Sequence, residues 1–440
     1  MKYVKLYAAI PAVFLAPNLS AQPGGAPPGV TATQVTAIYP EIEKLYMDLH
    51  RNPELAFHEQ RTAAELAKRV SALGYEVTTG IGGTGLVAIM KNGPGPVVML
   101  RTELDALPIE ERTGLAFAST VKAKNDAGET VPVAHACGHD LHMSAWVGTA
   151  ELMAHNRQQW HGTLMLVGQP AEEIVSGAAA MIKDGLFTRF PKPDYALGVH
   201  DDPSMPAGVV GFHPGFFRAA ASNLDVTIFG TGGHGAYPNN TVDPVVIAAR
   251  FVLGLQTAVS RENNPMEPAV ISVGSIHGGI TWNIIPDRVK LQLTVRSLNP
   301  ETQKQLLSAI AREAKGEALA ANAPKEPVIE TRSSTDAVYN DPGLTQRMVT
   351  AARAALGTAN VVEMPAQMGS EDFSQFGLAG VHAVLLHIGA VDPAKLEAAR
   401  NSGVQLPGLH SPLWAPELEP TLKAAVAAET AILLDLLKSG

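Results

Sequence analysis

The six residues HACGHD (135–140) place the only cysteine of this 440-residue chain between two histidines and before an aspartate. Thiolate, imidazole and carboxylate are the groups that bind zinc and similar ions in proteins. A cysteine that only fills a core needs no such neighbours. The thiolate form of Cys137 is further favoured if a helix begins near Asp140, as the pattern indicates. The segment therefore predicts a metal site in which Cys137 is a ligand.

Four other polar motifs carry residues of the same chemistry. GQPAEE ends in the adjacent Glu172 and Glu173, GVHDDP and GLHSP supply His200 and His410, and the fourth motif is RTELDALP (101–108). A carboxylate within reach of a water can move its protons. One glutamate could thus bind metal while the other works on the water, and the residues alone do not say which. Together the motifs indicate a metal site with space for two ions.

The elements expected to position these motifs form an α/β domain. Residues 36–74 have helical spacing with a break at Asn52, and Gly74 is typical of a helix C-cap. Short apolar runs separated by helical stretches indicate the buried strands of a mostly parallel sheet. The runs are 85–90, 97–100, 163–168, 195–199 and 383–388. Three of the motifs directly follow such runs, which is where ligands bind in open α/β sheets.

Residues 220–332 follow a different pattern. Strand-like and helical segments come in the order β-α-β-β-α-β, which is typical of ferredoxin-like folds. Because the apolar α/β pattern resumes afterwards, we predict a small α+β domain inserted into a larger catalytic domain. The predicted parts are a signal peptide (1–21), a flexible N-terminus (22–34), the catalytic domain (35–219 and 333–440) and the inserted domain (220–332).

The first 21 residues have the layout of a secretory signal peptide. Lys2 and Lys5 precede an apolar stretch that Pro11 and Pro17 interrupt, and cleavage is expected after Ala21. The stretch is shorter than the roughly 20 residues that span a bilayer. We therefore expect an exported protein, periplasmic or secreted, with no membrane segment after cleavage.

The single cysteine and the net charge narrow the possible partners. A lone cysteine in an exported protein is a free thiol, a link to another chain or a metal ligand. The net charge of −9, without a basic block, argues against nucleic acid as a partner.

Nine motifs, taken in chain order, resemble those of one enzyme family. They are LHRNPELAFHEQRTA (49–63), GGTGLVA (82–88), RTELDALPIEE, HACGHDLH, GQPAEE, GGHGAYP (232–238), NIIPD (283–287), MGSEDFSQF (368–376) and LHSP. They resemble the co-catalytic metallo-amidohydrolases that include hippurate hydrolase, bacterial N-acyl-amino-acid amidohydrolases and plant auxin-conjugate hydrolases. The resemblance spans residues 35–436. It implies a zinc-peptidase-like catalytic domain whose inserted domain serves as lid and dimerisation domain.

The resemblance also implies the ligands of two divalent ions. Cys137 would bridge the ions, and His139, Glu173, His200 and His410 would complete their ligand shells. The ions would be Zn²⁺ or Mn²⁺, with Co²⁺ and Ni²⁺ as further candidates, because metal availability as well as ligand type sets the occupancy.

Four more residues have roles implied by the resemblance. Glu172 would be the general base and acid that works on the attacking water. His234, in the inserted domain, would reach the active site of a partner subunit and stabilise the oxyanion, which implies a homodimer through this domain. Asn283 would lie in the lid near the substrate. Arg296 is our candidate for binding the substrate carboxylate.

The chain departs from the family in two of the motifs. Thr102 and Glu103 stand where the family has Ala and Asp, and the longer Glu103 is expected to rearrange its contacts. Asp201 and Asp202 follow the histidine where the family more often has an aromatic residue, which would make the site entrance more acidic. Six other histidines have no assigned ligand role: His135 and His142, which either orient ligands or pack, and His213, His277, His382 and His387.

These observations predict an enzyme that hydrolyses the amide bond of N-acyl or N-aroyl amino acids to a carboxylic acid and a free amino acid. A dipeptidase or carboxypeptidase with the same two ions is the alternative, so the expected partner is an N-acyl amino acid or a short peptide. A catalytically silent binding protein is the third interpretation. The presence of all five expected ligands and of Glu172 argues against it.

Overall fold

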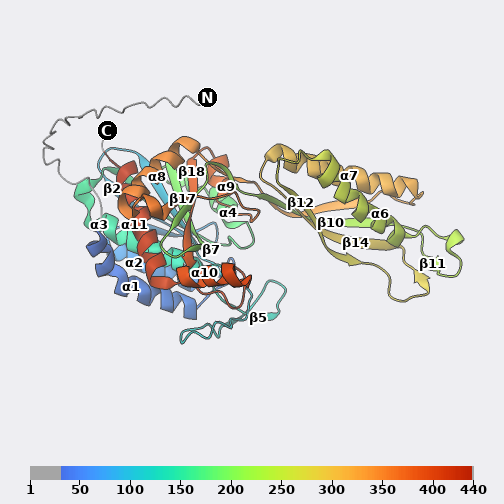
Figure 1. Ribbon diagram of the computed structural model, residues 1–440, viewed down its shortest axis with the longest axis horizontal. Coiled ribbons are helices and arrows are strands. Elements are labelled where there is room, and N and C mark those ends of the chain that lie inside the picture. Colours follow the sequence, from blue (N-terminus) through green and yellow to red (C-terminus); the bar gives the residue numbers. More distant parts are fainter. Residues whose placement is uncertain (1–30, 439–440) are drawn as a thin grey trace, which may run out of the picture.

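The computed structural model describes residues 31–438, which form a large body and an elongated second unit at its side (Figure 1). The expected signal peptide lies outside the described residues. Within residues 31–438, no helix is both long and apolar enough to cross a membrane.

An eight-stranded sheet forms the centre of the large body. Its strand order is β1 (Glu76–Ile81), β2 (Gly85–Asn92), β6 (Gly162–Gln169), β3 (Val97–Glu103), β7 (Tyr195–Pro206), β18 (His382–Val391), β8 (Val210–Phe212) and β17 (Val361–Glu363). The central strands β6, β3, β7 and β18 are parallel, whereas β1 and β2 pair antiparallel. All five apolar runs are strands of this sheet, so the predicted mostly parallel α/β fold is confirmed.

Helices cover both faces of this sheet. The larger helical layer contains α1 (Ala32–Arg51), α2 (Gln60–Ala72), α3 (His139–His155), α8 (Pro342–Leu356) and α11 (Leu418–Leu436). The opposite face carries α4 (Gly177–Lys183), α5 (Leu186–Arg189) and α9 (Ser374–Leu378). Because side chains alternate along a strand, neighbours in β3 enter different cores. Leu100 packs with Trp146 of α3, whereas Met99 packs in the cluster that includes Phe376 of α9.

The first helix begins earlier than expected. Thr31 and Gln34 form a capping box, in which the Thr31 hydroxyl accepts from the Gln34 N–H and the Gln34 side chain accepts from the Thr31 N–H. This cap starts α1 at Ala32, so residues 32–34 are helical rather than part of the flexible N-terminus predicted for 22–34. Residues 22–30 lie outside the described part.

The inserted segment, residues 220–335, is called the lid below. Its main elements are β10 (Ala220–Phe229), α6 (Pro244–Thr257), β12 (Ala269–His277), β14 (Arg288–Ser297), α7 (Pro300–Ala320) and β15 (Val328–Thr335). The antiparallel sheet order β12-β14-β10-β15 is the split βαβ arrangement that the sequence pattern predicts. A core of its own, around Phe251 and Leu291, fixes its two helices on the sheet. β15 ends three residues beyond the predicted boundary at 332.

Two pairs of short strands mark the ends of the lid. Where the chain enters and leaves it, β9 (Gly215–Arg218) pairs with β16 (Val338–Asn340), so both crossings lie side by side. At the end farthest from the large sheet, β11 (Gly233–His234) pairs with β13 (Ile284–Ile285) (Figure 1).

Candidate metal centre

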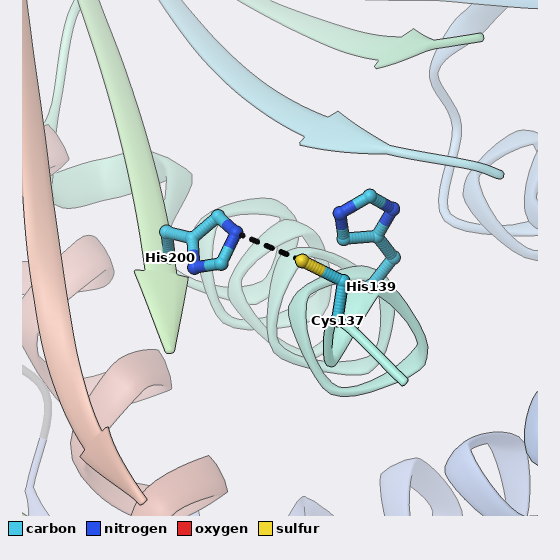
Figure 2. A group of neighbouring side chains, drawn as sticks. All are labelled: Cys137, His139 and His200. Atoms are coloured by element: carbon cyan, nitrogen blue, oxygen red, sulfur yellow. Dashed lines mark hydrogen bonds between the residues drawn. The ribbon is translucent and has the colours of Figure 1, made fainter. Parts of the chain in front are cut away.

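The turn before α3 fixes the position of Cys137. Gly138 has a φ of +78°, and a Cβ there would collide with the carboxylate of Asp201 on β7, so only glycine fits. This close approach places the Cys137 sulfur 3.6 Å from Nε2 of His200 (Figure 2). The same sulfur lies 3.3 Å from Nε2 of His410. Two predicted ligands from distant parts of the chain therefore converge on the sulfur of the third.

Backbone carbonyls orient two of the imidazoles. Nδ1 of His139 lies 2.8 Å from the Asp105 carbonyl oxygen, and Nδ1 of His200 lies 2.8 Å from the Asp201 carbonyl oxygen. Such contacts keep the proton on Nδ1, so Nε2 carries the lone pair that can bind metal. His410 is held differently, in the left-handed region at φ +63° with its N–H bonded to the Ala136 carbonyl at 2.7 Å.

The two adjacent glutamates occupy different positions in the centre. The Glu173 carboxylate lies between two imidazoles, with Oε1 3.9 Å from Nε2 of His139 and Oε2 3.3 Å from Nε2 of His410. Glu172 approaches only His139, with 3.8 Å between Oε2 and Nε2. The backbone N–H of Glu173 donates to Oδ2 of Asp105 at 2.9 Å, which fixes the loop after β6. Glu173 therefore lies near two of the predicted histidine ligands, His139 and His410, whereas Glu172 lies near His139 alone.

The donor atoms fit a pair of divalent ions. Cys137, His139 and His200 form one group whose ligand atoms lie within 4.8 Å of one another, and Cys137, Glu173 and His410 form a second. Cys137 is common to both groups, as a bridging thiolate must be. Nε2 of His139 and Oε1 of Glu173 are buried without a hydrogen-bond partner among the described residues. Because buried polar atoms normally have partners, these orphan atoms are consistent with metal binding.

The electrostatics of the site explain why it requires a cation. Burial raises the pKa of the Cys137 thiol well above its ordinary value, and the nearby Glu173 raises it further. Without bound ions, desolvation and the neighbouring carboxylates therefore oppose the thiolate form that the start of α3 was expected to favour. Burial followed by Glu371 also raises the pKa of Glu172, and burial raises that of Glu173 to about 7. Divalent cations would offset this buildup of buried negative charge.

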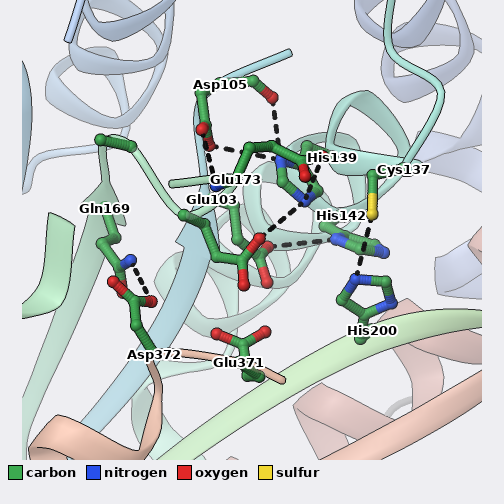
Figure 3. A network of polar contacts seen from close by, with 12 residues as sticks. Glu103, Asp105, Cys137, His139, His142, Gln169, Glu173, His200, Glu371 and Asp372 are labelled. Atoms are coloured by element: carbon green, nitrogen blue, oxygen red, sulfur yellow. Dashed lines mark hydrogen bonds and ion pairs between the residues drawn. The ribbon is translucent and has the colours of Figure 1, made fainter. Parts of the chain in front are cut away.

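Glu371 and Asp372 lie beside the metal centre (Figure 3), where they belong to a buried ion network. Arg101 on β3 pairs with Glu103, with Glu371 at 2.8 Å and with Asp372 at 3.2 Å. Asp372 also accepts from Nε2 of Gln169 at 2.6 Å, which connects the network to the end of β6. The sequence motifs contain these residues, but their spacing gave no sign of the network. It forms only when folding brings Glu371 next to Arg101, which lies 270 positions earlier in the sequence.

Glu103 and His142 form a second support. Nδ1 of His142 lies 3.1 Å from Oε2 of Glu103, and its Nε2 accepts from the Asp201 N–H at 2.8 Å. Both ring nitrogens are thereby occupied, so His142 orients its neighbours. His135 is buried, and its ring nitrogens have no hydrogen-bond partner within residues 31–438.

The two acidic residues after His200 line a cavity beside the metal centre, but both are buried, so they do not form the exposed acidic entrance that the sequence suggested. Asp201 is fully buried, with Oδ1 3.3 Å from Nε2 of His142, and Asp202 is buried against His387. Their charges are used within the protein, because β7 carries them into the interior beside β18. In this register His387 pairs directly with His200, so a histidine without assigned role lies beside the metal centre.

The lid residues separate into two groups. Arg296 lines a cavity of about 900 Å³ that also contains Cys137, Glu172 and His410, and its Nη1 donates to the Met368 carbonyl at 3.0 Å. His234 and Asn283 are exposed at the far end of the lid, where the Gly235 N–H donates to the Asn283 carbonyl at 2.8 Å. Neither lines the cavity of its own chain.

A family model described as peptidase family M20/M25/M40 matches residues 99–407, which include most of the residues of the centre. The chain belongs to this family. The resemblance noted in the sequence motifs is thereby confirmed, and the protein is a metal-dependent amidohydrolase.

Three similar proteins show how far the M20 likeness extends. Hippurate hydrolase of Campylobacter jejuni is 38% identical over 277 residues, which cover 63% of this chain and 69% of that protein. N-acetyldiaminopimelate deacetylase of Leuconostoc mesenteroides is 34% identical over 379 residues, 84% of this chain and 95% of that protein. A dinuclear metal binding M20 peptidase from Bacillus subtilis has a TM-score of 0.74 at 26% identity, covering 92% of this chain and 100% of its own.

Proposed function

We propose that this M20 hydrolase cleaves the amide bond of N-acyl or N-aroyl amino acids, and that Cys137 would be a ligand shared by two divalent ions. The observation that carries the proposal is the shared position of Cys137 in two ligand groups, with Glu172 beside them. His139, Glu173, His200 and His410 are the proposed remaining ligands. When bound, such ions would supply a water whose pKa falls from 15.7 to about 7 and a positive charge that polarises a carbonyl oxygen.

Glu172 is the proposed general base. It lines the cavity, and its raised pKa suits a group that takes a proton from water and returns it to the leaving nitrogen. Glu173, which lies between His139 and His410, is the better ligand of the two. The contrast between the two positions supports the division of labour that the family resemblance implies.

The substrate class rests on the named relatives and on the cavity. Hippurate hydrolase and N-acetyldiaminopimelate deacetylase are named for acylated amino acids. Arg296 on the cavity wall supplies a cation for the free carboxylate of such a substrate. A dipeptide also carries this carboxylate, so dipeptidase activity is the alternative to be tested.

A homodimer through the lid is part of the proposal. His234 lies too far along the lid to line the cavity of its own chain (Figure 1). Beside it, Ile280 and Trp282 are 94% and 97% exposed, which is unusual for large apolar side chains and favours a partner surface. The oxyanion would then be stabilised by the partner subunit's His234, and the nearby Asn283 would contact the same substrate.

The proposal is tested by assaying hippurate, N-acetyl amino acids and unblocked dipeptides side by side, with metal content measured on the same preparation. Turnover of the acylated substrates by protein that holds two ions is the expected result. If only unblocked dipeptides are cleaved, the enzyme is a dipeptidase and the proposed N-acyl-amino-acid substrates are wrong. Full activity without stoichiometric metal would overturn the mechanism. Export with cleavage after Ala21 is a separate part of the proposal. N-terminal sequencing of the mature protein should then find Gln22 as its first residue.

A further inference from the structure

The cavity beside the metal centre contains two arginines whose charge is not paired. Three arginines line it: Arg218, Arg296 and Arg332. Arg332 is neutralised by ion pairs with Asp225 and Glu330. Among the described residues, no carboxylate lies within ion-pair distance of Arg218 or Arg296. Arg218 is buried and Arg296 is partly buried, and a buried cation without a partner is costly, so this wall of the cavity is suited to an anionic group.

Arg218 is held rigidly by neutral partners. Its Nη1 donates to Oε1 of Gln367 at 3.1 Å and to Nε2 of His387 at 3.3 Å, and its Nη2 donates to the Ser370 carbonyl at 3.4 Å. Gly369 leaves room for the guanidinium, since a Cβ there would come within 2.9 Å of Nη2. The head group is therefore fixed in place rather than free to fold away.

Asp202 orders both neighbours of Arg218. Its Oδ2 lies 2.8 Å from Nδ1 of His387 and accepts from Nε2 of Gln367 at 2.8 Å, which closes a ring of four side chains. Because arginine can only donate, Nε2 of His387 must accept the hydrogen bond from Arg218. Nδ1 of His387 therefore carries the ring proton and donates a hydrogen bond to Asp202. Asp202 thus positions the guanidinium without itself forming an ion pair with it.

The guanidinium of Arg218 retains unused binding capacity. The residue is 8% exposed and lines the cavity, and its Nη2 donates only one hydrogen bond within residues 31–438, to the Ser370 carbonyl. Arg296 approaches from the lid wall, and burial followed by repulsion from Arg218 lowers the pKa of Arg296. Two cations thus lie close together in the cavity that contains Glu172 and Cys137.

We infer that Arg218 is a specificity-determining residue and that the preferred substrates carry a second carboxylate. Arg296 takes the α-carboxylate of the amino acid, and Arg218 binds a further carboxylate, either on the amino-acid side chain or on the acyl group. This inference rests on the proposed amide hydrolysis, because it names the substrate that the same site prefers. Both sources of the carboxylate present the same chemistry to the guanidinium, and the substrates of the test distinguish them.

The test compares matched acidic and neutral substrates. N-acetyl-glutamate against N-acetyl-glutamine places the charge on the side chain, and N-succinyl-alanine against N-butyryl-alanine places it on the acyl group. We expect one acidic member to be preferred by about 10- to 100-fold in kcat/KM, as for a charge-assisted hydrogen bond. Arg218→Met should abolish that preference, mainly through KM, while Arg218→Lys retains part of it. Arg332→Met, which removes a cavity arginine that is already paired, is the matched control.

Each outcome has a distinct meaning. Equal turnover of the acidic and neutral members by the wild-type enzyme overturns the inference and leaves the proposed function intact. An equal loss on both members in Arg218→Met, with metal content unchanged, also overturns it, because Arg218 would then bind the α-carboxylate or only support the fold. If the wild-type enzyme holds metal and cleaves hippurate but none of these four substrates, the inference is overturned and the proposed function stands. If it holds metal and cleaves neither hippurate nor any of the four, the proposed function itself fails.

Discussion

Oε1 of Glu59, at the start of α2, accepts a hydrogen bond from the backbone N–H of Ala171 at 2.8 Å. The same oxygen accepts from the Phe57 N–H at 2.9 Å, and the Thr84 hydroxyl bonds to Oε2. Ala171 and Phe57 both have left-handed backbones, with φ of +50° and +60°. One buried carboxylate therefore holds two unfavourable conformations, and one of them starts the turn that carries Glu172.

Loss of Glu59 should loosen the metal centre without removing a ligand. Because Glu59→Ala releases the turn at Ala171, we expect metal affinity or activity to fall by about 10- to 100-fold, as for partners that orient ligands. Glu59→Gln keeps an oxygen that can accept a hydrogen bond, so its metal affinity and activity should fall less than those of Glu59→Ala. Titration of the apo-protein with Zn²⁺ measures the effect. Glu65→Ala, on the outer part of the same helix, is the control, and equal losses in both alanine variants would contradict the role.

Glutamine substitutions at the two adjacent glutamates should have different consequences. Glu172→Gln is expected to keep both ions and lose roughly 10²–10⁴-fold in kcat, the typical contribution of a general base. Glu173→Gln removes a charged oxygen between His139 and His410, so it should lose metal first. Metal analysis with kcat on each variant separates the two. Metal loss in Glu172→Gln, with retention in Glu173→Gln, would exchange their roles.

The sequence could predict which residues meet, because the meeting point follows from strand order. Apolar runs mark the strands, and polar residues at the ends of β3, β6 and β7 necessarily share one edge of the sheet. Most of the supporting contacts could not be predicted, although His142 was among the candidates for orienting ligands. Asp105 acts through its backbone carbonyl on His139 and through Oδ2 on the Glu173 N–H, and Glu371 reaches Arg101 only in the folded chain. The raised pKa of Cys137 likewise depends on burial, which no local pattern reports.

Arg218 illustrates the same limit at the substrate end of the site. It lies in a segment where the sequence indicated only the approach to the inserted domain, and nothing in its neighbours distinguishes it from a surface arginine. Its burial follows from the pairing of β9 with β16 and from Gln367 and His387, which come 149 and 169 residues later. A spacing argument could not bring these side chains together.

Glu429 on α11 should make the protein less stable as the pH rises. Burial raises the pKa of its carboxyl from 4.5 to about 8, although the Thr149 hydroxyl donates to it at 2.6 Å. Between these values the unfolded chain loses this proton and the folded chain keeps it, so the cost of folding grows by about 1.4 kcal/mol per pH unit. Above pH 8 the cost is constant.

Glu429→Gln keeps an acceptor for Thr149 and removes the titration. We expect it to be more stable than wild type at pH 8 and to differ much less at pH 5, as measured by urea unfolding with metal held saturating. A stability difference between the two proteins that is the same at both pH values would contradict the assignment, because the ionisation of Glu429 is the only term that distinguishes them.

Two inactive variants should restore activity when their subunits are mixed. If the His234 imidazole works in the partner's site, a subunit with Glu172→Gln still lends its His234, and a subunit with His234→Ala still has Glu172. A mixed dimer then has one complete site and one site that lacks both groups. With random pairing, half of the dimers are mixed and about a quarter of all sites are complete. Refolding or subunit exchange of the two proteins, followed by assay, should therefore recover up to about a quarter of wild-type activity.

Two results would contradict this role of His234. If His234 acted within its own chain, no site in any dimer would be complete and mixing would recover no activity. If light scattering showed that the fully active wild-type protein is a monomer, there would be no shared site.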